Sequence, residues 1–156
     1  MIFSDKVSKT EVEEYLRAHN IRPSIQRMAV MEYLANHRTH PSINDIYRAL
    51  HPTVSTLSRT TVYNTLHLLA EAKAVKELSM EDNVCYYDAD TSNHAHYKCR
   101  QCCKIYDLFE TEIPLLAEIK KLVENDSRFD SADLYFRGIC PKCAEKEERK
   151  KKQKFI

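Results

Sequence analysis

Apolar residues recur every three or four positions through the first half of the chain, in four segments separated by helix-capping and helix-breaking residues. Ser8 and Glu11 form a capping box before the first segment, and Ser42 can cap the third. Pro23 suits the first turn of the second. We therefore predict four helices. Their inward-facing positions are Val12, Tyr15 and Leu16, then Ile25, Ala29 and Leu34, then Ile43, Ile46, Tyr47 and Leu50, and finally Val62, Leu66 and Leu69.

From residue 75 onward, the spacing of apolar residues changes from the three to four positions of a helix to the two positions of a strand. Residues 75–80 and 84–87 predict a hairpin that turns at Asp82-Asn83. Residues 94–98, 105–109 and 133–139 predict further strands, and residues 114–124 predict a helix. The fold class is therefore α+β. We expect a winged helix-turn-helix domain at residues 1–87, a small α/β domain at residues 88–145 and a basic disordered tail at residues 146–156.

The predicted fourth helix begins at Ser58 or Thr60 and carries polar residues on its outward side. They combine positive charge, hydrogen-bonding groups and an aromatic ring, which suits contact with phosphates and base edges in a DNA major groove. An ordinary solvated helix face fits the pattern equally well. The outward residues are Arg59, Thr61, Tyr63, Asn64 and His67.

Four cysteines form two C-x-x-C pairs, Cys99 with Cys102 and Cys140 with Cys143. Two such pairs can complete a tetrahedral site of four thiolates, which suits Zn2+. A redox dithiol and a set of disulfides are the alternatives, and the second is disfavoured if the chain is cytoplasmic. A second group of potential ligands surrounds the first pair. Its harder nitrogen and oxygen donors indicate a chemically different metal site, and its members are Asp88, His94, His96 and Asp107.

Composition narrows the class of protein. The chain has 156 residues, of which 43% are hydrophobic, so it can build one large core or two small ones. No apolar run approaches the ~18 residues of a membrane span, and no signal peptide is evident, so we expect a cytoplasmic protein. The net charge is +1, so binding to nucleic acid would need a local patch. Residues 146–156 hold six Lys or Arg against two Glu.

Several of these features occur together in one family. The motifs are Arg22-Pro-Ser-Ile-Gln-Arg27, His40-Pro-Ser-Ile-Asn-Asp-Ile-Tyr47, Thr61-Val-Tyr-Asn-Thr-Leu66, Asn93-His-Ala-His96 and the two cysteine pairs. In this combination the chain resembles the ferric uptake regulator family over residues 8–146. That resemblance implies a dimeric, metal-dependent transcriptional repressor that binds an inverted-repeat operator in double-stranded DNA.

The resemblance also implies roles for individual residues. Cys99, Cys102, Cys140 and Cys143 match the ligands of one structural Zn2+ per chain. The regulatory site for Fe2+ or Mn2+ is matched by His40, Asp88, His94, His96 and Asp107. Since His40 lies in the DNA-binding half, this site would join the two domains. The recognition helix is matched by Tyr63 and its neighbours.

The chain departs from the family pattern in ways that indicate its branch. Asp rather than Glu stands at Asp88 and Asp107, and Asn64 replaces a common Arg. Both features resemble the peroxide-sensing branch, in which hydrogen peroxide reacts with bound Fe2+ and oxidises a ligand histidine. The matching positions are His40 and His94. Such a protein is a single-turnover sensor and not an enzyme.

Other departures concern the remaining ligands. Asn93 and Ala95 remove two ligands of a further metal site found in many members, so we expect that site to be missing. Cys103 stands where Gly usually follows the first pair, and Cys85 is a second unmatched thiol.

Several alternatives stay open. Within the family, the same ligands could serve an iron-availability repressor, and Cys85 keeps a zinc-uptake regulator in view. Outside the family, a zinc metalloenzyme would need an open metal position, which four thiolates do not leave. A zinc-stapled interaction module without DNA binding is the remaining alternative.

Overall fold

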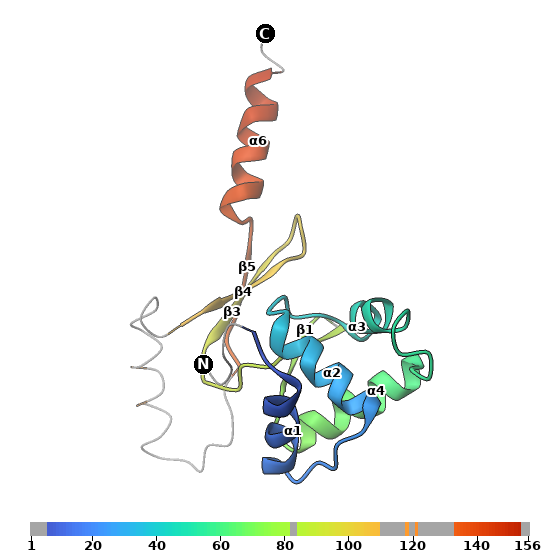
Figure 1. Cartoon of the computed structure of the whole chain (residues 1–156). Coiled ribbons are helices and arrows are strands. Elements are labelled where there is room, and N and C mark those ends of the chain that lie inside the picture. Colours follow the sequence, from blue (N-terminus) through green and yellow to red (C-terminus); the bar gives the residue numbers. More distant parts are fainter. Residues whose placement is uncertain (1–5, 82–83, 110–117, 119–120, 122–132, 154–156) are drawn as a thin grey trace. The chain divides into compact units, whose positions relative to one another are not determined.

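A computed structural model describes residues 6–81, 84–109, 118, 121 and 133–153 (Figure 1). The chain divides into two compact units, residues 1–92 and residues 93–156. This division falls later than the predicted boundary after residue 87 and places the basic C-terminal segment within the second unit. The α+β class, with helices first and a small sheet afterwards, is confirmed. None of the described helices is long and apolar enough to cross a membrane.

Unit 1 contains four helices followed by a hairpin. They are α1 (Lys9–Ala18), α2 (Ile25–Asn36), α3 (Ile43–Leu50) and α4 (Arg59–Glu71), then β1 (Lys76–Glu81) and β2 (Val84–Asp88). A serine caps each helix and accepts a hydrogen bond from the third backbone N–H of that helix. The caps of α1 and α3 are full capping boxes, in which Ser8 pairs with Glu11 and Ser42 with Asp45. The expected position of Pro23 is wrong, because Ser24 caps α2 and Pro23 precedes the helix.

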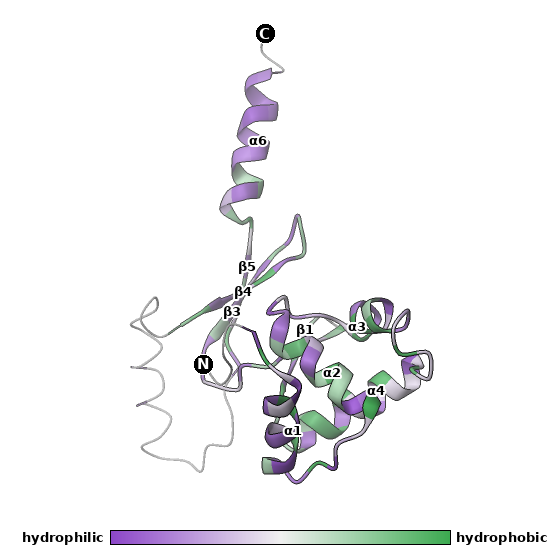
Figure 2. Cartoon of the chain, in the orientation of Figure 1, coloured by the Kyte–Doolittle hydropathy of each residue, from purple (hydrophilic) through white to green (hydrophobic). Residues whose placement is uncertain are grey.

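The buried faces of the four helices join in one hydrophobic core, to which the hairpin contributes Tyr87. Figure 2 shows hydrophobic and hydrophilic residues alternating along α2 and α4. Ile25 departs from the predicted inward stripe of α2, since 75% of its surface is exposed. The core residues include Val12, Leu16, Val30, Met31, Leu34, Ile46, Val62, Leu66, Leu69, Ala74 and Val75.

Unit 2 contains a three-stranded sheet and one described helix. Its elements are β3 (Ala95–Cys99), β4 (Ile105–Leu108), β5 (Tyr135–Gly138) and α6 (Pro141–Gln153), and the strand order is β4-β3-β5. Strand β3 runs antiparallel to β4 and parallel to β5. Alternation along β3 places His96 on one face of the sheet and Tyr97 with Cys99 on the other. The predicted helix at residues 114–124 lies almost entirely outside the described residues.

The C-terminal segment differs from its prediction. Residues up to Gln153 are helical, so the expectation of a disordered tail from residue 146 is wrong over that range. Helix α6 begins at Pro141, where the missing N–H of proline costs no hydrogen bond, and ends in lysines, which complement the negative end of the helix dipole. The prediction of disorder was based on the run of basic residues at 149–154. Figure 2 shows that most of α6 is hydrophilic.

Among the described residues, four residues other than glycine have a positive φ. The chain contains one glycine, so it is not available for these left-handed positions. Asn20 and Lys73 adopt positive φ directly after the C-caps of α1 and α4. Cys103 has φ of 58° in the loop between β3 and β4, and His40 has φ of 51° before α3. The single glycine, Gly138, lies against Tyr97, and a Cβ atom there would collide with the hydroxyl of Tyr97 unless that side chain shifted.

Candidate metal centres and nucleic-acid surface

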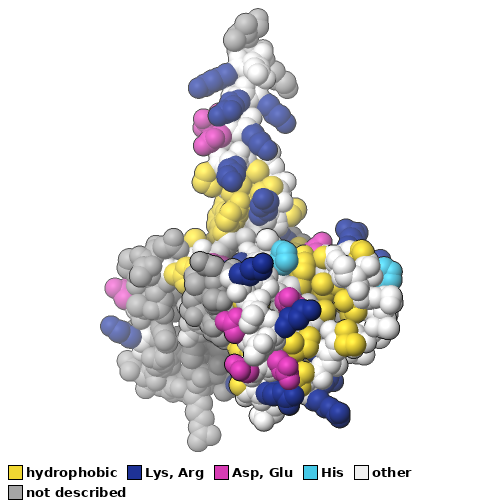
Figure 3. Space-filling model, in the orientation of Figure 1, with side chains coloured by type: hydrophobic (Ala, Val, Ile, Leu, Met, Phe, Trp, Pro, Cys, Tyr) yellow, Lys and Arg dark blue, Asp and Glu magenta, His cyan; other side chains and the backbone are white. Residues whose placement is uncertain are grey.

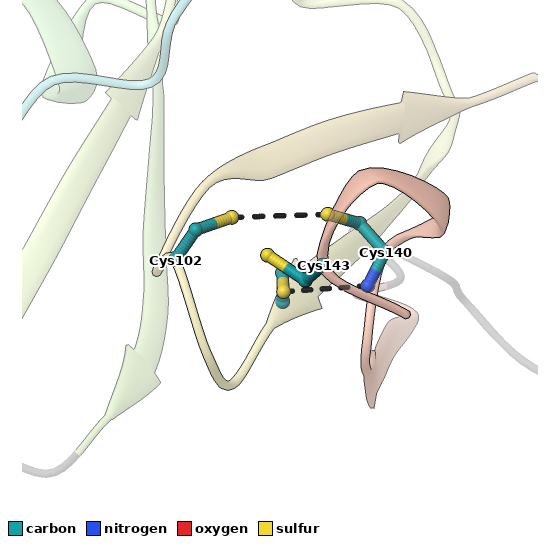
Figure 4. A group of neighbouring side chains, drawn as sticks. Cys102, Cys140 and Cys143 are labelled. Atoms are coloured by element: carbon teal, nitrogen blue, oxygen red, sulfur yellow. Dashed lines mark hydrogen bonds between the residues drawn. The ribbon is translucent and has the colours of Figure 1, made fainter. Parts of the chain in front are cut away.

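The two C-x-x-C pairs meet in unit 2, and their four Sγ atoms lie within 4.8 Å of one another (Figure 4). Cys99 ends β3, Cys102 lies in the following loop, and Cys140 and Cys143 lie at the start of α6. The Sγ atoms of Cys102 and Cys140 are 3.8 Å apart. Thiolates at ~2.3 Å from a tetrahedral zinc ion would be separated by ~3.8 Å. The four residues therefore fit a closed Zn2+ site.

Local hydrogen bonds prepare this cluster for a cation. Backbone N–H donors lower the pKa of the Cys99 thiol to about 6, and the donor with the largest effect, the N–H of Cys140, lies 3.3 Å from its sulfur. The pKa of Cys140 is also lowered, by the backbone of Cys143 and by the Tyr106 hydroxyl. Burial and the neighbouring thiols raise the pKa of Cys143 to about 12. Cys143 therefore keeps its proton at neutral pH until a metal ion replaces it.

A second cluster lies on the opposite face of the same sheet. His96 on β3 is the cross-strand partner of Asp107 on β4. The Nε2 atoms of His94 and His96 lie 3.4 and 3.6 Å from the same oxygen, Asp107 Oδ1. These distances exceed a good hydrogen bond, and they match the ~3.0–3.6 Å between two atoms that each bind one ion at ~2.1 Å. Two imidazoles and a carboxylate thus converge as metal ligands do.

Unit 1 contains a smaller pair with the same chemistry. His40 Nε2 lies 3.7 Å from Asp88 Oδ2, and both side chains are buried. The other carboxylate oxygen, Asp88 Oδ1, accepts a hydrogen bond of 2.8 Å from the N–H of Asp90, which fixes the carboxylate and turns Oδ2 to His40. The left-handed backbone of His40 costs about 1 kcal/mol or more, and strain of this kind is concentrated at functional sites.

The remaining cysteines stand apart from both clusters. Cys103 is exposed, and its N–H donates to the carbonyl of Cys99 in the loop of the first C-x-x-C pair. Its positive φ explains why glycine would suit this position. Cys85 is half-buried on β2, and burial raises the pKa of its thiol.

The outward face of α4 is the candidate surface for nucleic acid. Tyr63 is 52% exposed, and Asn64 and His67 are exposed beside it. Arg59 is held in place, since its Nε donates to Asn44 Oδ1 at 3.2 Å and its guanidinium lies 4.7 Å from the centroid of the Tyr47 ring. The sequence alone could not show that α3 positions this arginine.

A polar groove extends this surface to the start of α2. It is lined by Arg22, Gln26 and Arg27 from one side and by Thr61 and Asn64 of α4 from the other. Arg27 donates to the carbonyl of Arg22 at 2.8 Å, which holds the two basic residues together. From the sequence, Arg22 and Arg27 are recognised only as part of a family motif and not as candidate DNA contacts. Their basic character was the available signal, but their proximity to α4 depends on the tertiary fold.

The fold and the two clusters together define the class of protein. A helical unit that ends in a β-hairpin is followed by a sheet unit that holds a four-cysteine cluster and a His/Asp cluster. The model of the ferric uptake regulator family matches residues 18–137. The chain belongs to the ferric uptake regulator family.

Similar proteins agree with this assignment. The peroxide-responsive repressor PerR of Staphylococcus aureus strain Mu50 is 37% identical over 135 residues, covering 84% of this chain and 88% of that protein. The solved structure of Helicobacter pylori Fur has a TM-score of 0.69 at 21% identity, covering 91% of this chain and 97% of that one. For Vibrio cholerae Fur the TM-score is 0.68 at 19% identity, with 82% and 98% covered. These two structures support the fold, and the relatives are regulators rather than enzymes.

Proposed function

We propose that this protein is a dimeric, metal-dependent transcriptional repressor that senses hydrogen peroxide through a regulatory Fe2+ or Mn2+ site. The observation that carries the proposal is the convergence of His94 and His96 on one oxygen of Asp107. This donor set of imidazoles and carboxylates, without a thiolate, is one that suits Fe2+ or Mn2+. The similarity to a peroxide-responsive repressor from Staphylococcus aureus supports peroxide as the signal.

In this proposal the His40–Asp88 pair of unit 1 and the His94–His96–Asp107 group of unit 2 are ligands of one ion. An ion with ligands from both units favours the arrangement in which both sets can reach it. Its binding energy therefore selects one DNA-binding arrangement of a dimer. The Zn2+ held by Cys99, Cys102, Cys140 and Cys143 has the separate task of stabilising unit 2.

Bound Fe2+ would supply the one-electron chemistry that activates hydrogen peroxide next to its ligands. The imidazoles of His40 and His94 are the proposed targets: one peroxide oxygen is transferred to a ring carbon and the other leaves as water. The oxidised imidazole is a poorer donor, so the ion is lost and DNA is released. Because the histidine is not restored, each protein responds once.

The proposed DNA contacts are on α4. Tyr63, Thr61 and Asn64 would read base edges in the major groove, while Arg59 contacts a phosphate. A dimer would place two such helices on an inverted repeat. Tyr63→Ala should reduce the preference for selected over random duplexes. Arg59→Ala should weaken binding to both and reduce the salt slope by about 1.

The central experiment combines DNA selection with mass spectrometry. Duplexes are selected from a random library with the Mn2+-loaded protein, and binding is measured before and after the Fe2+-loaded protein meets peroxide. We expect binding to be lost together with the gain of one oxygen atom on a peptide that contains His40 or His94. Protein loaded with Mn2+ should keep its histidines and its DNA binding.

Two results would contradict the proposal. Recovery of DNA binding with dithiothreitol, or oxidation confined to Cys85 and Cys103, would indicate thiol sensing or an iron-availability repressor. His96→Ala should keep the fold and the zinc but lose metal-dependent DNA binding. Unchanged metal dependence in that variant would exclude His96 as a ligand.

A further inference from the structure

Helix α6 is strongly cationic. Over Pro141–Gln153 it carries six Lys or Arg against three Glu, and all six basic side chains are exposed. Figure 3 shows Lys and Arg side chains along most of its visible length. Four of them lie within a sector of about 100° around the helix axis and therefore form one stripe: Lys142, Lys146, Arg149 and Lys150. Lys151 points to nearly the opposite side of the helix, and Lys152 lies about 60° outside the sector, beyond Arg149.

The opposing charges do little to neutralise this stripe. Arg149 lies 4.0 Å from Glu145, and both side chains are well exposed, at 80% and 68%. Solvent screens an exposed pair at this distance, so the pair is weak and the guanidinium can bind another anion instead. The four basic residues therefore remain available as a continuous positive surface.

The order of this helix depends on the cysteine cluster. Cys143 is the buried residue of α6, and the basic half has no buried side chain. An isolated helix of this length is marginal in water, particularly with adjacent like charges. Fixing Cys140 and Cys143 to a metal holds the first turn in helical geometry, from which the rest can propagate.

The chemistry of the stripe selects its partner. Helices that bind membrane surfaces pair a basic face with a large apolar face. Helix α6 has no such face, since its apolar residues are confined to its first four positions. Regularly spaced basic side chains without apolar neighbours suit the evenly spaced phosphates of a nucleic-acid backbone, which they contact without reading sequence.

We infer that α6 is a zinc-anchored basic arm that adds sequence-independent contacts to the phosphates of duplex DNA. This inference rests on the proposed function for the identity of the polyanion. It assigns a second DNA-binding surface, distinct from α4. Its effect is on the overall affinity and the salt dependence rather than on the choice of sequence.

The test uses the full-length, zinc-loaded protein and a short duplex of arbitrary sequence, with affinity measured as a function of salt. Lys146→Gln/Lys150→Gln removes two charges from the stripe, and Lys151→Gln/Lys152→Gln removes two from outside it. The stripe variant should lower the slope of log affinity against log salt by about 2, as expected for two lost phosphate contacts. The control pair should change it by less than half as much. Zinc content and circular dichroism verify that both variants are folded.

Equal slopes in wild type and the stripe variant, or equal losses in both variants, would overturn the inference. So would binding to phosphatidylglycerol-containing vesicles that requires Lys146 and Lys150 while DNA binding does not. The proposed function fails separately: if no duplex is enriched in the presence of Mn2+, the repressor proposal fails even where the stripe governs the salt slope. Enrichment with an unchanged slope would instead reject the arm alone.

Discussion

The two units reach a stable fold by different means. Among its described residues, unit 1 has a core cluster of seventeen buried hydrophobic residues, drawn from the four helices, strand β2 and the segments that connect the elements. Among the described residues of unit 2, the buried apolar side chains are Ala95 and Ile105 besides three of the four clustered cysteines. Around those cysteines pack Tyr97 and Ile139. The first unit therefore resembles an ordinary small domain, whereas in the second the metal cluster occupies the place of a core.

This difference indicates which single substitutions should lower the stability of each unit most. Burial of hydrophobic side chains is spread over many residues, each worth about 1.5–3 kcal/mol, so no single one determines the fold of unit 1. A structural zinc site concentrates about 10–16 kcal/mol in four ligands, according to measurements on small zinc-binding peptides. Loss of one thiolate should thus affect unit 2 far more than loss of one leucine affects unit 1.

The largest effect is expected from Cys143→Ser. Without the fourth thiolate the site cannot close, so zinc should be lost and unit 2 should unfold while unit 1 keeps its helices. Metal analysis and amide hydrogen exchange, read unit by unit, measure this. Cys103→Ser is the matched control, because Cys103 is exposed and outside the cluster. A zinc-free Cys143→Ser protein with a protected β3–β5 sheet would show that unit 2 has a sufficient core of its own.

The converse change is Leu66→Ala in unit 1, where Leu66 is fully buried. It should lower the free energy of unfolding of unit 1 by about 2–5 kcal/mol, through lost burial and a residual cavity. Zinc content and the protection of unit 2 should not change. Chemical denaturation followed by a probe in each unit gives the measurement. A matching loss of stability in unit 2 would mean that the units do not fold independently.

The next largest effect is expected from acid, which should destabilise unit 2 at a higher pH than unit 1. The lowered pKa of Cys99, about 6 against an ordinary 9.0, stabilises the folded form fully above pH 9 and loses that contribution as pH falls through about 6. Zinc binding also displaces the proton of Cys143, so affinity falls with acidity throughout. Zinc release followed with a fluorescent indicator should therefore steepen near pH 6, before unit 1 unfolds. Simultaneous loss of both units would contradict this order.

The smallest expected effect compares two left-handed residues. Lys73→Gly in unit 1 and Cys103→Gly in unit 2 each relieve a positive φ, by about 1 kcal/mol. Each should stabilise its own unit, as seen in the denaturant midpoint of that unit. In zinc-free protein the gain from Cys103→Gly should disappear, since its loop is ordered by the cluster. A gain that persists without zinc would indicate that this loop is formed independently of the metal.

Much of unit 1 could be predicted from the sequence because its signals are local. The serine caps and the three-to-four-residue spacing of apolar residues specify helices without reference to distant residues. The errors occurred where local signals compete, as at Pro23, which precedes the cap at Ser24. The helix α6 was missed for the complementary reason: its residues have no apolar pattern, and its start depends on cysteines that are brought together by the fold.

The types of ligand and the order of the elements follow from residue identities and short spacings along the chain. Two C-x-x-C pairs indicate a thiolate site at any sequence separation, because each pair is preorganised within one turn of chain. The approach of Asp107 to His94 and His96 could not be predicted in this way, since it depends on the register of β4 on β3. The same holds for Arg59 on Asn44 and Tyr47, and for Arg22 and Arg27 beside α4. Residue types and short spacings are encoded locally, whereas the approach of side chains from separate elements depends on how those elements pack.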